Sequence, residues 1–123
     1  MESQIRRIVR IAVPLGDVYA MGPGKADLLE AIHATGSISA AGRKLGMSYR
    51  RAWLLVDEMN RCFQTPLVEA RLGGSGGGGA KVTALGHLVL ERYRAIQALA
   101  WEGIRKSVQD FQELLKPEAG DAR

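Results

Sequence analysis

The stretch that decides the fold reads Gly36-Ser37-Ile38-Ser39-Ala40-Ala41-Gly42-Arg43-Lys44-Leu45-Gly46-Met47-Ser48-Tyr49-Arg50-Arg51-Ala52-Trp53. It predicts a short helix, a tight turn at Gly46 and a second helix that begins with basic side chains. Ser37 and Ser48 are suitable N-caps, because a serine hydroxyl accepts a hydrogen bond from a backbone N–H of the first turn. Gly46 stands where the chain must leave the first helix, a place that favours a left-handed backbone. The stretch is typical of a helix-turn-helix, which fits the major groove of DNA.

The second helix of this pair is expected to be amphipathic. At 100° per residue, one stripe faces the core and contains Ala52, Leu55, Val56, Met59, Cys62 and Phe63. The opposite side carries Arg50, Leu54, Asp57 and Arg61, with Arg51 and Trp53 at its margins and Tyr49 at the edge of the buried stripe. The helix therefore offers arginines outward at its start and packs inward along the rest.

A glycine-rich hairpin is expected after this helix. Residues 67–72 can form a strand, Gly73–Gly79 the turn and Ala80–Val82 the return strand. Such a hairpin could serve as a wing against the phosphate backbone. The glycine run also matches G-x-G-x-x-G literally, but a strand-like segment follows it instead of a helix, which argues against a nucleotide site.

The two flanks of this unit complete the predicted organisation. Ile5–Val13 is rich in β-branched residues and is expected to form a short strand, and residues 25–34 follow helical spacing. A long helix is expected over residues 84–115, and about 30 residues at about 1.5 Å each exceed what one small domain covers. Part of its apolar stripe is therefore expected to meet a second subunit. The residues assigned to that dimer interface are Val89, Tyr93, Ile96, Ala100, Ile104, Val108 and Phe111.

Composition favours one domain over residues 1–116, a flexible tail over residues 117–123 and a polyanionic partner. Lys and Arg outnumber Asp and Glu by 17 to 13, and the segment from Arg43 to Arg51 contains basic but no acidic residues.

The single cysteine, Cys62, excludes an intrachain disulfide and a cysteine-cluster metal site. No secretory signal and no apolar run near the ~18 residues of a membrane span is present, so a cytoplasmic location is expected. His33 and His87 lack metal-ligand spacing, and no catalytic constellation stands out. No enzyme activity, metal or cofactor is expected.

The residues expected to contact double-stranded DNA lie in the helix pair and the hairpin. Base readout is assigned to Tyr49, Arg50, Arg51 and Leu54, since arginine offers two donors to guanine. Phosphate contacts are assigned to Arg43, Lys44, Arg61 and Lys81. The remaining expected contacts are Ser37, Ser48, Trp53, Gly76 and Gly77. Two alternatives stay open: the arginines form a solvated helix face, or Trp53 packs against the first helices instead of the DNA backbone.

Several segments together resemble one known family. They are Ser37-Ile38-Ser39, Met47-Ser48-Tyr49-Arg50-Arg51-Ala52-Trp53, Glu58-Met59-Asn60, Leu67-Val68-Glu69 and a glycine loop that ends in Gly79-Ala80 before Thr83-x-x-Gly86. In these segments the chain resembles the N-terminal domain of the ModE molybdate-responsive regulators and, more distantly, the LysR-type regulators.

The resemblance implies a fold that is mainly α-helical with a small β hairpin, a winged helix-turn-helix with a long C-terminal dimerisation helix. It implies a homodimeric regulator of transcription that acts in molybdenum homeostasis and binds a palindromic operator. Helix 48–63 would read bases, and the wing at residues 73–81 would hold the flanking backbone. Full-length members carry molybdate-binding modules, which no part of this chain resembles. The alternatives are a basic protein-interaction module and an oxyanion sensor that holds its ligand at the helix starts of Ser37 or Ser48.

Overall fold

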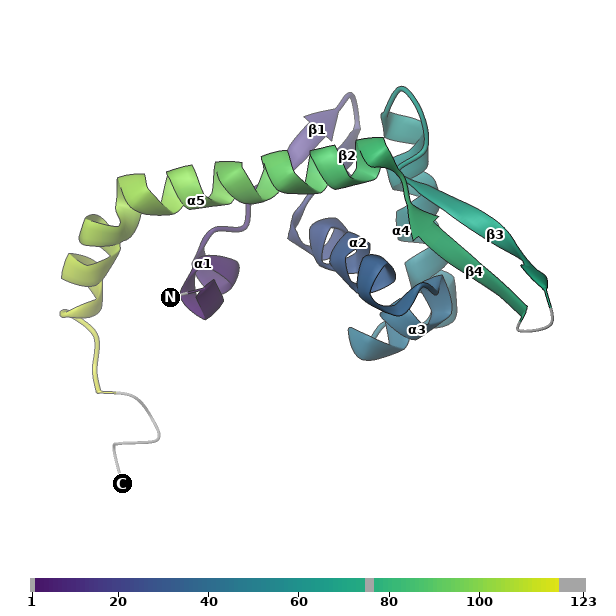
Figure 1. The fold of residues 1–123 in the computed structure, drawn as a ribbon. Coiled ribbons are helices and arrows are strands. Elements are labelled where there is room, and N and C mark those ends of the chain that lie inside the picture. Colours follow the sequence, from purple (N-terminus) through teal and green to yellow (C-terminus); the bar gives the residue numbers. More distant parts are fainter. Residues whose placement is uncertain (1, 75–76, 118–123) are drawn as a thin grey trace.

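The computed structural model describes residues 2–74 and 77–117 (Figure 1). Its elements, in chain order, are α1 (Glu2–Ile8), β1 (Val13–Leu15), β2 (Val18–Met21), α2 (Pro23–Thr35), α3 (Ile38–Lys44), α4 (Tyr49–Cys62), β3 (Val68–Gly74), β4 (Gly77–Val82) and α5 (Ala84–Gln112). β1 pairs with β2, and β3 pairs with β4, each in an antiparallel hairpin. The expectation of a mainly helical chain with a small hairpin and a long last helix is confirmed.

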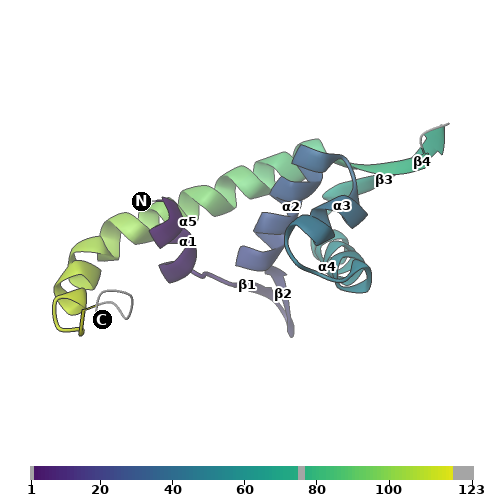
Figure 2. The same cartoon turned by 90° about the horizontal axis from the view of Figure 1, so that it is seen from below.

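The core lies where α2, α3 and α4 pack together, as Figure 2 shows from below. Its largest fully buried side chains are Leu28, Leu29, Ile32, Met59 and Leu67. Small residues let α3 and α4 approach closely. A Cβ added to Gly42 would lie 3.0 Å from the Cβ of Ala52, so this helix pair depends on its small side chains.

Local signals place the ends of the helix pair as predicted. The hydroxyl of Ser37 accepts from the Ala40 N–H at 3.0 Å, and that of Ser48 accepts from the Arg51 N–H at 3.0 Å. Gly46 has φ of 74°, the left-handed conformation that glycine adopts without a steric penalty. The turn between α3 and α4 is therefore specified by residues within the turn itself.

Side chains of α4 and of the loop before α5 hold the β3–β4 hairpin in place. The amide oxygen of Asn60 accepts from the N–H of Leu67 at 2.8 Å, and its amide nitrogen donates to the Val68 carbonyl at 3.0 Å. Thr83 accepts from the Gly86 N–H at the start of α5 and donates to the Pro66 carbonyl at 2.8 Å. The hairpin therefore leaves the body of the domain at a defined angle.

Helix α5 runs from the base of this hairpin across the body and beyond it (Figure 1). Its first half is tied to the N-terminal segment. The hydroxyl of Tyr93 donates to the Ile11 carbonyl at 2.6 Å, and the amide of Gln97 donates to the Val9 carbonyl at 3.0 Å. The second half extends past the helical cluster. Trp101 is still buried there, but Leu99, Ile104 and Phe111 are exposed, Phe111 by 64%.

Four charged side chains join α1, α2 and α5. Arg94 donates to Asp27 at 2.8 Å and to Glu30 at 2.7 Å, and Arg6 reaches the same two carboxylates at 2.8 and 3.2 Å. Burial alone would raise the pKa of the Glu30 carboxyl, but the hydrogen bonds and charges of Arg94 and Arg6 outweigh it and lower that pKa. Burial alone would lower the pKa of Arg94, and its hydrogen bonds to Glu30 and Asp27 raise it instead.

The strand expected over Ile5–Val13 is wrong. Residues up to Ile8 are helical, and an extended strand begins only at Val13. Ile5, Ile8 and Val9 also fit a helical spacing, and the helix lets Arg6 reach the acids of α2. The loop expected before residue 25 contains the β1–β2 hairpin, which turns at Gly16 with φ of 59°. None of the helices in the described part of the chain combines the length and the apolar run that a membrane span needs.

Candidate nucleic-acid interface

The start of α4 is the most exposed part of the helix-turn-helix. Tyr49, Arg50, Arg51, Trp53 and Leu54 are all exposed. Leu54 is 52% exposed although it is apolar. The buried residues of the same helix are Ala52, Leu55, Val56 and Met59. The predicted division of α4 into a core stripe and an outward basic start is therefore confirmed for these residues, while Cys62 and Phe63 are only half-buried.

A groove lies between the start of α4 and the wing. It has a volume of about 270 Å³ and is lined by Ser37, Ile38, Ser39, Tyr49, Trp53, Ala70, Arg71, Gly79 and Ala80. The rings of Tyr49 and Trp53 meet edge to face, with centroids 6.1 Å apart. Trp53 is 39% exposed and stands outside the buried core. Its indole is therefore presented to the groove rather than packed beneath the first helices.

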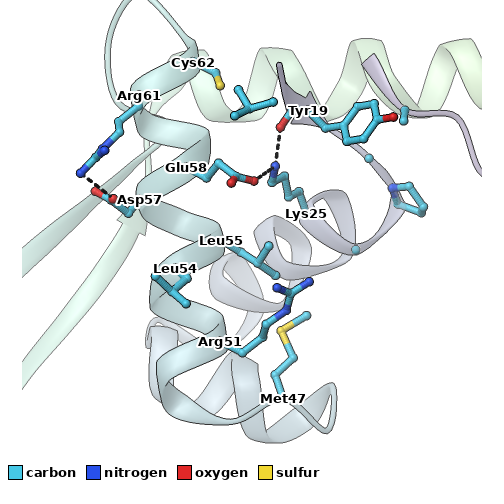
Figure 3. A pocket seen from close by; sticks show the side chains of 15 residues that line it. Tyr19, Lys25, Met47, Arg51, Leu54, Leu55, Asp57, Glu58, Arg61 and Cys62 are labelled. Atoms are coloured by element: carbon cyan, nitrogen blue, oxygen red, sulfur yellow. Dashed lines mark hydrogen bonds and ion pairs between the residues drawn. The ribbon is translucent and has the colours of Figure 1, made fainter. Parts of the chain in front are cut away.

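The other side of α4 borders a wider concavity of about 690 Å³, shown in Figure 3. Its walls come from α4, the start of α2 and the β1–β2 hairpin. Lys25, only 6% exposed, donates there to the Tyr19 carbonyl and to the Glu58 carboxylate. Arg51 turns toward Met47 on this side (Figure 3). Arg50 and Arg51 thus serve different faces: Arg51 lines the concavity, and Arg50 is not among its lining residues.

The other predicted phosphate contacts of the helix pair lie at the end of α3 and in the last turn of α4. Arg43 donates to the Ser39 hydroxyl at 3.0 Å, one turn earlier on α3, and Lys44 is exposed at the helix end. Arg61 pairs with Asp57 at 3.1 Å, and both side chains are exposed. Exposed pairs of this kind contribute little stability, so Arg61 can exchange its carboxylate for another anion.

The wing brings one predicted residue and one unpredicted residue to the interface. Lys81 is exposed on β4, opposite Glu69. Arg71, which the sequence analysis missed, lines the groove beside Tyr49 and Trp53. A lone arginine just before a glycine run was the available signal. Gly77 begins β4, while Gly76 lies outside the described residues.

The residues assigned to a dimer interface fall into three groups by exposure. Ile96, Ile104 and Phe111 are exposed, and the half-buried members are Val89, Ala100 and Val108. Tyr93 is only 3% exposed and packs in its own core. Tyr93 is therefore removed from the expected dimer interface, because its ring packs in the core of its own chain and its hydroxyl donates to the Ile11 carbonyl.

In the part of the chain that the structure describes, no group of three or more His, Cys, Asp and Glu side chains could hold a metal ion. The acids of α4 and the wing are Asp57 and Glu58, which pair with Arg61 and Lys25, and Glu69, which lies opposite Lys81. The start of α4 carries the cations Arg50 and Arg51 with the rings of Tyr49 and Trp53, and the wing adds Arg71 and Lys81. This chemistry suits phosphates, sugars and base edges.

No family model matches the chain, but curated proteins do. MopB of Rhodobacter capsulatus, a molybdenum-pterin-binding protein, is 43% identical over 95 residues, which cover 77% of this chain and 34% of MopB. The transcriptional regulator ModE of Yersinia pestis is 35% identical over 96 residues, 76% of this chain and 36% of ModE. The DNA-binding transcriptional dual regulator ModE of Escherichia coli K12 is 41% identical over 71 residues, 58% and 27% of the two chains.

The chain spans about a third of the length of these curated relatives. None of the three is named as an enzyme. Among solved structures, the crystal structure of the CbnR DNA-binding domain in complex with DNA superposes with a TM-score of 0.55 at 23% identity. The match covers 71% of this chain and 94% of the CbnR chain, and it confirms the winged helix-turn-helix fold. The resemblance is thus confirmed: over about three quarters of its length this chain is similar to the ModE-type regulators.

Proposed function

We propose that this chain is a sequence-specific DNA-binding unit of a ModE-type transcription regulator. The observation that carries the proposal is the start of α4, where Arg50 is exposed and the exposed Tyr49 and Trp53 line a groove against the wing. Two kinds of relative support it. Similar ModE proteins are named as transcriptional regulators, and the structurally similar CbnR domain was crystallised with DNA.

In this function α4 enters the major groove of double-stranded DNA with its N-terminal turn toward the bases. Arg50 offers two donors to a guanine edge, while Tyr49 and Leu54 contact neighbouring bases. Arg51, from the opposite margin of α4, reaches the edge of the same site. Trp53 lies against the sugar-phosphate backbone, between α4 and the wing.

Phosphate contacts supply affinity and a strong dependence on salt. Arg43, Lys44 and Arg61 contribute them from the helix pair, and Lys81 and the glycine turn from the wing. The hydroxyls of Ser37 and Ser48 are engaged as caps, so these residues act by orienting helix starts toward the backbone.

The proposed unit is a homodimer formed through α5. The exposed apolar side chains of Ile96, Ile104 and Phe111 would be buried if α5 packed against a second copy of α5, which presents the same apolar stripe. Two α4 helices would then meet successive major-groove faces about 34 Å apart, which requires a palindromic operator. We further propose a cytoplasmic role in molybdenum homeostasis, from the likeness to ModE proteins.

Selection from randomised duplexes tests the proposal, followed by fluorescence anisotropy at about 0.15 M salt with and without molybdate. The expected result is enrichment of one palindromic site that binds more tightly than unrelated duplexes. Failure to enrich any sequence, with weak binding that salt abolishes, would favour a basic protein-interaction module instead. A change in affinity on adding molybdate would favour the oxyanion-sensor alternative.

A further inference from the structure

The chain has two histidines, and the fold brings them into contact. His33 lies in the last turn of α2, and His87 lies in the first turn of α5. Their ring centroids are 4.7 Å apart, with the rings perpendicular. Both residues are exposed. The pair therefore forms at the surface, where α2 and α5 meet the base of the wing.

The pair borders a concavity of about 320 Å³ that is strongly basic. Its lining residues include Gly36 and Ala80 and the side chains of His33, His87, Arg71 and Lys81. β3 contributes the Arg71 guanidinium and β4 contributes the Lys81 ammonium, and no lining residue is acidic. The acids on the neighbouring elements are not among its lining residues. Glu30, one turn before His33, is held by Arg94 and Arg6, and Glu91, one turn beyond His87, is exposed. On the wing, Glu69 is exposed opposite Lys81.

This concavity adjoins the groove of the candidate nucleic-acid interface. Arg71 and Ala80 line both it and the groove of Tyr49 and Trp53. The backbone N–H of Ala80 donates a hydrogen bond of 2.8 Å to the Gly36 carbonyl, which holds the base of the wing beside the α2–α3 turn. A DNA strand that passes the groove would have its next phosphates over the histidine pair.

We propose that His33 and His87, together with Arg71 and Lys81, hold a backbone phosphate of DNA, and that protonation of the imidazoles strengthens this contact. The proposal rests on the proposed DNA-binding function. An imidazolium offers two N–H donors to phosphate oxygens. His33 also stands at the C-terminal end of α2, where the helix dipole favours a cation.

Charge repulsion makes the contact depend on protons. Two adjacent imidazolium rings beside Arg71 and Lys81 repel one another unless an anion lies between them. Phosphate binding and protonation therefore favour each other, as linked equilibria must. Histidine is the side chain that ordinarily changes charge between pH 5 and 8, and this pair is the whole histidine content of the chain. DNA affinity should thus rise as the pH falls through this range.

The test compares DNA affinity at pH 6.0 and pH 8.0, at constant ionic strength, on the duplex that selection yields. The wild type is expected to bind about three- to tenfold more tightly at pH 6.0, with a steeper salt dependence because the protonated site neutralises its phosphate more fully. The double variant His33→Gln/His87→Gln should bind the selected duplex with the same affinity at pH 6.0 as at pH 8.0. Lys106→Gln, which removes a cation from the distant half of α5, should retain the gain.

The outcomes separate this proposal from the proposed function. A wild type that selects one duplex but binds it equally at both pH values overturns the histidine contact alone. A double variant that keeps the pH dependence of the wild type also overturns it. A wild type that selects no duplex at either pH overturns both the function and the contact.

Nuclear magnetic resonance of the imidazole protons distinguishes the source of the phosphate. Micromolar selected duplex should shift the ring signals of His33 and His87, while inorganic phosphate at the same low concentration should leave them unchanged. Signals that respond to inorganic phosphate but not to duplex would assign the site to a free oxyanion and overturn the DNA contact.

Discussion

The backbone N–H of Ala80 donates a hydrogen bond of 2.8 Å to the carbonyl of Gly36. This bond joins the return strand of the wing to the turn between α2 and α3. Gly36 reaches the position with φ of 72°, in the left-handed region. The wing and the helix-turn-helix are thereby fixed to one another at the edge where both would meet DNA.

Gly79→Ala is predicted to break this junction. A Cβ at position 79 would lie 2.9 Å from the Gly36 carbonyl oxygen, a backbone atom that cannot turn aside. We expect the free energy of unfolding to fall by about 1–3 kcal/mol, as measured by urea denaturation, and DNA affinity to fall with it. The control is Gly24→Ala, where the added methyl meets nothing within 4 Å. Wild-type stability in Gly79→Ala would contradict the tight contact.

Arg50→Ala and Lys81→Ala are predicted to weaken DNA binding in different ways. Loss of Arg50 should cost about 1–3 kcal/mol at the selected site and relax the preference at one base pair. Loss of Lys81 should weaken all sequences alike and lower the salt slope by about 1. Anisotropy titrations on the selected duplex and its single-base variants measure both. Equal weakening of every duplex by Arg50→Ala would make Arg50 a phosphate contact only.

The parts of the fold that the sequence predicted are those with local causes. The caps Ser37 and Ser48, the turn at Gly46 and the buried stripe of α4 each depend on residues within a few positions. The helical N-terminal segment was missed because its stabilising partners, Asp27 and Glu30 of α2, are distant in sequence. Short apolar spacing alone does not decide between strand and helix.

The candidate site was predicted in part for the same reason. Helical periodicity placed Tyr93 and Phe111 on one stripe of α5, but it cannot tell which part of the stripe the chain covers itself. Tyr93 is covered and Phe111 is not. Arg71 and the meeting of His33 with His87 depend on how the wing packs beside α2 and α5, which no local pattern reports.

Acid is predicted to destabilise the domain through Glu30. Arg94 and Arg6 lower the pKa of the Glu30 carboxyl in the folded chain. The ionised carboxylate therefore contributes its full stabilisation at pH values above the ordinary glutamate pKa near 4.5. That contribution is lost as the pH falls from there through the lowered value. Glu30→Gln should therefore have a lower free energy of unfolding than the wild type at pH 7. Its free energy of unfolding should fall less than that of the wild type on acidification, as measured by urea denaturation at pH 7 and at a pH below the ordinary glutamate value. Glu91→Gln, at an exposed position, is the control, and parallel pH profiles for Glu30→Gln and the wild type would refute the assignment.

Ile104→Asp is predicted to dissociate the proposed dimer. The residue is 40% exposed beyond the helical cluster, so an aspartate there should leave the fold of the monomer intact. Dimer formation would bury its carboxylate without a partner, which is unfavourable. Sedimentation should show monomers, and affinity for the full palindrome should fall far more than affinity for a half-site. Ala95→Asp places the same acid on the opposite side of α5 and should remain dimeric. A dimeric Ile104→Asp would exclude this stripe as the interface.

The ion pair between buried Lys25 and exposed Glu58 leads to a prediction of unequal mutational effects. Lys25 is 6% exposed, whereas the Glu58 side chain is 45% exposed. Glu58→Ala leaves a buried ammonium with only the Tyr19 carbonyl as a partner and should cost about 1–3 kcal/mol. Lys25→Met removes the buried charge and leaves a carboxylate that water can reach, so it should cost less.

Urea denaturation measures the loss of stability in both variants. The control is Asp57→Ala, which removes the exposed partner of Arg61 and should change stability by under about 1 kcal/mol. A larger loss in Lys25→Met than in Glu58→Ala would mean that the lysine stem, rather than its ion pair, holds α2 against α4.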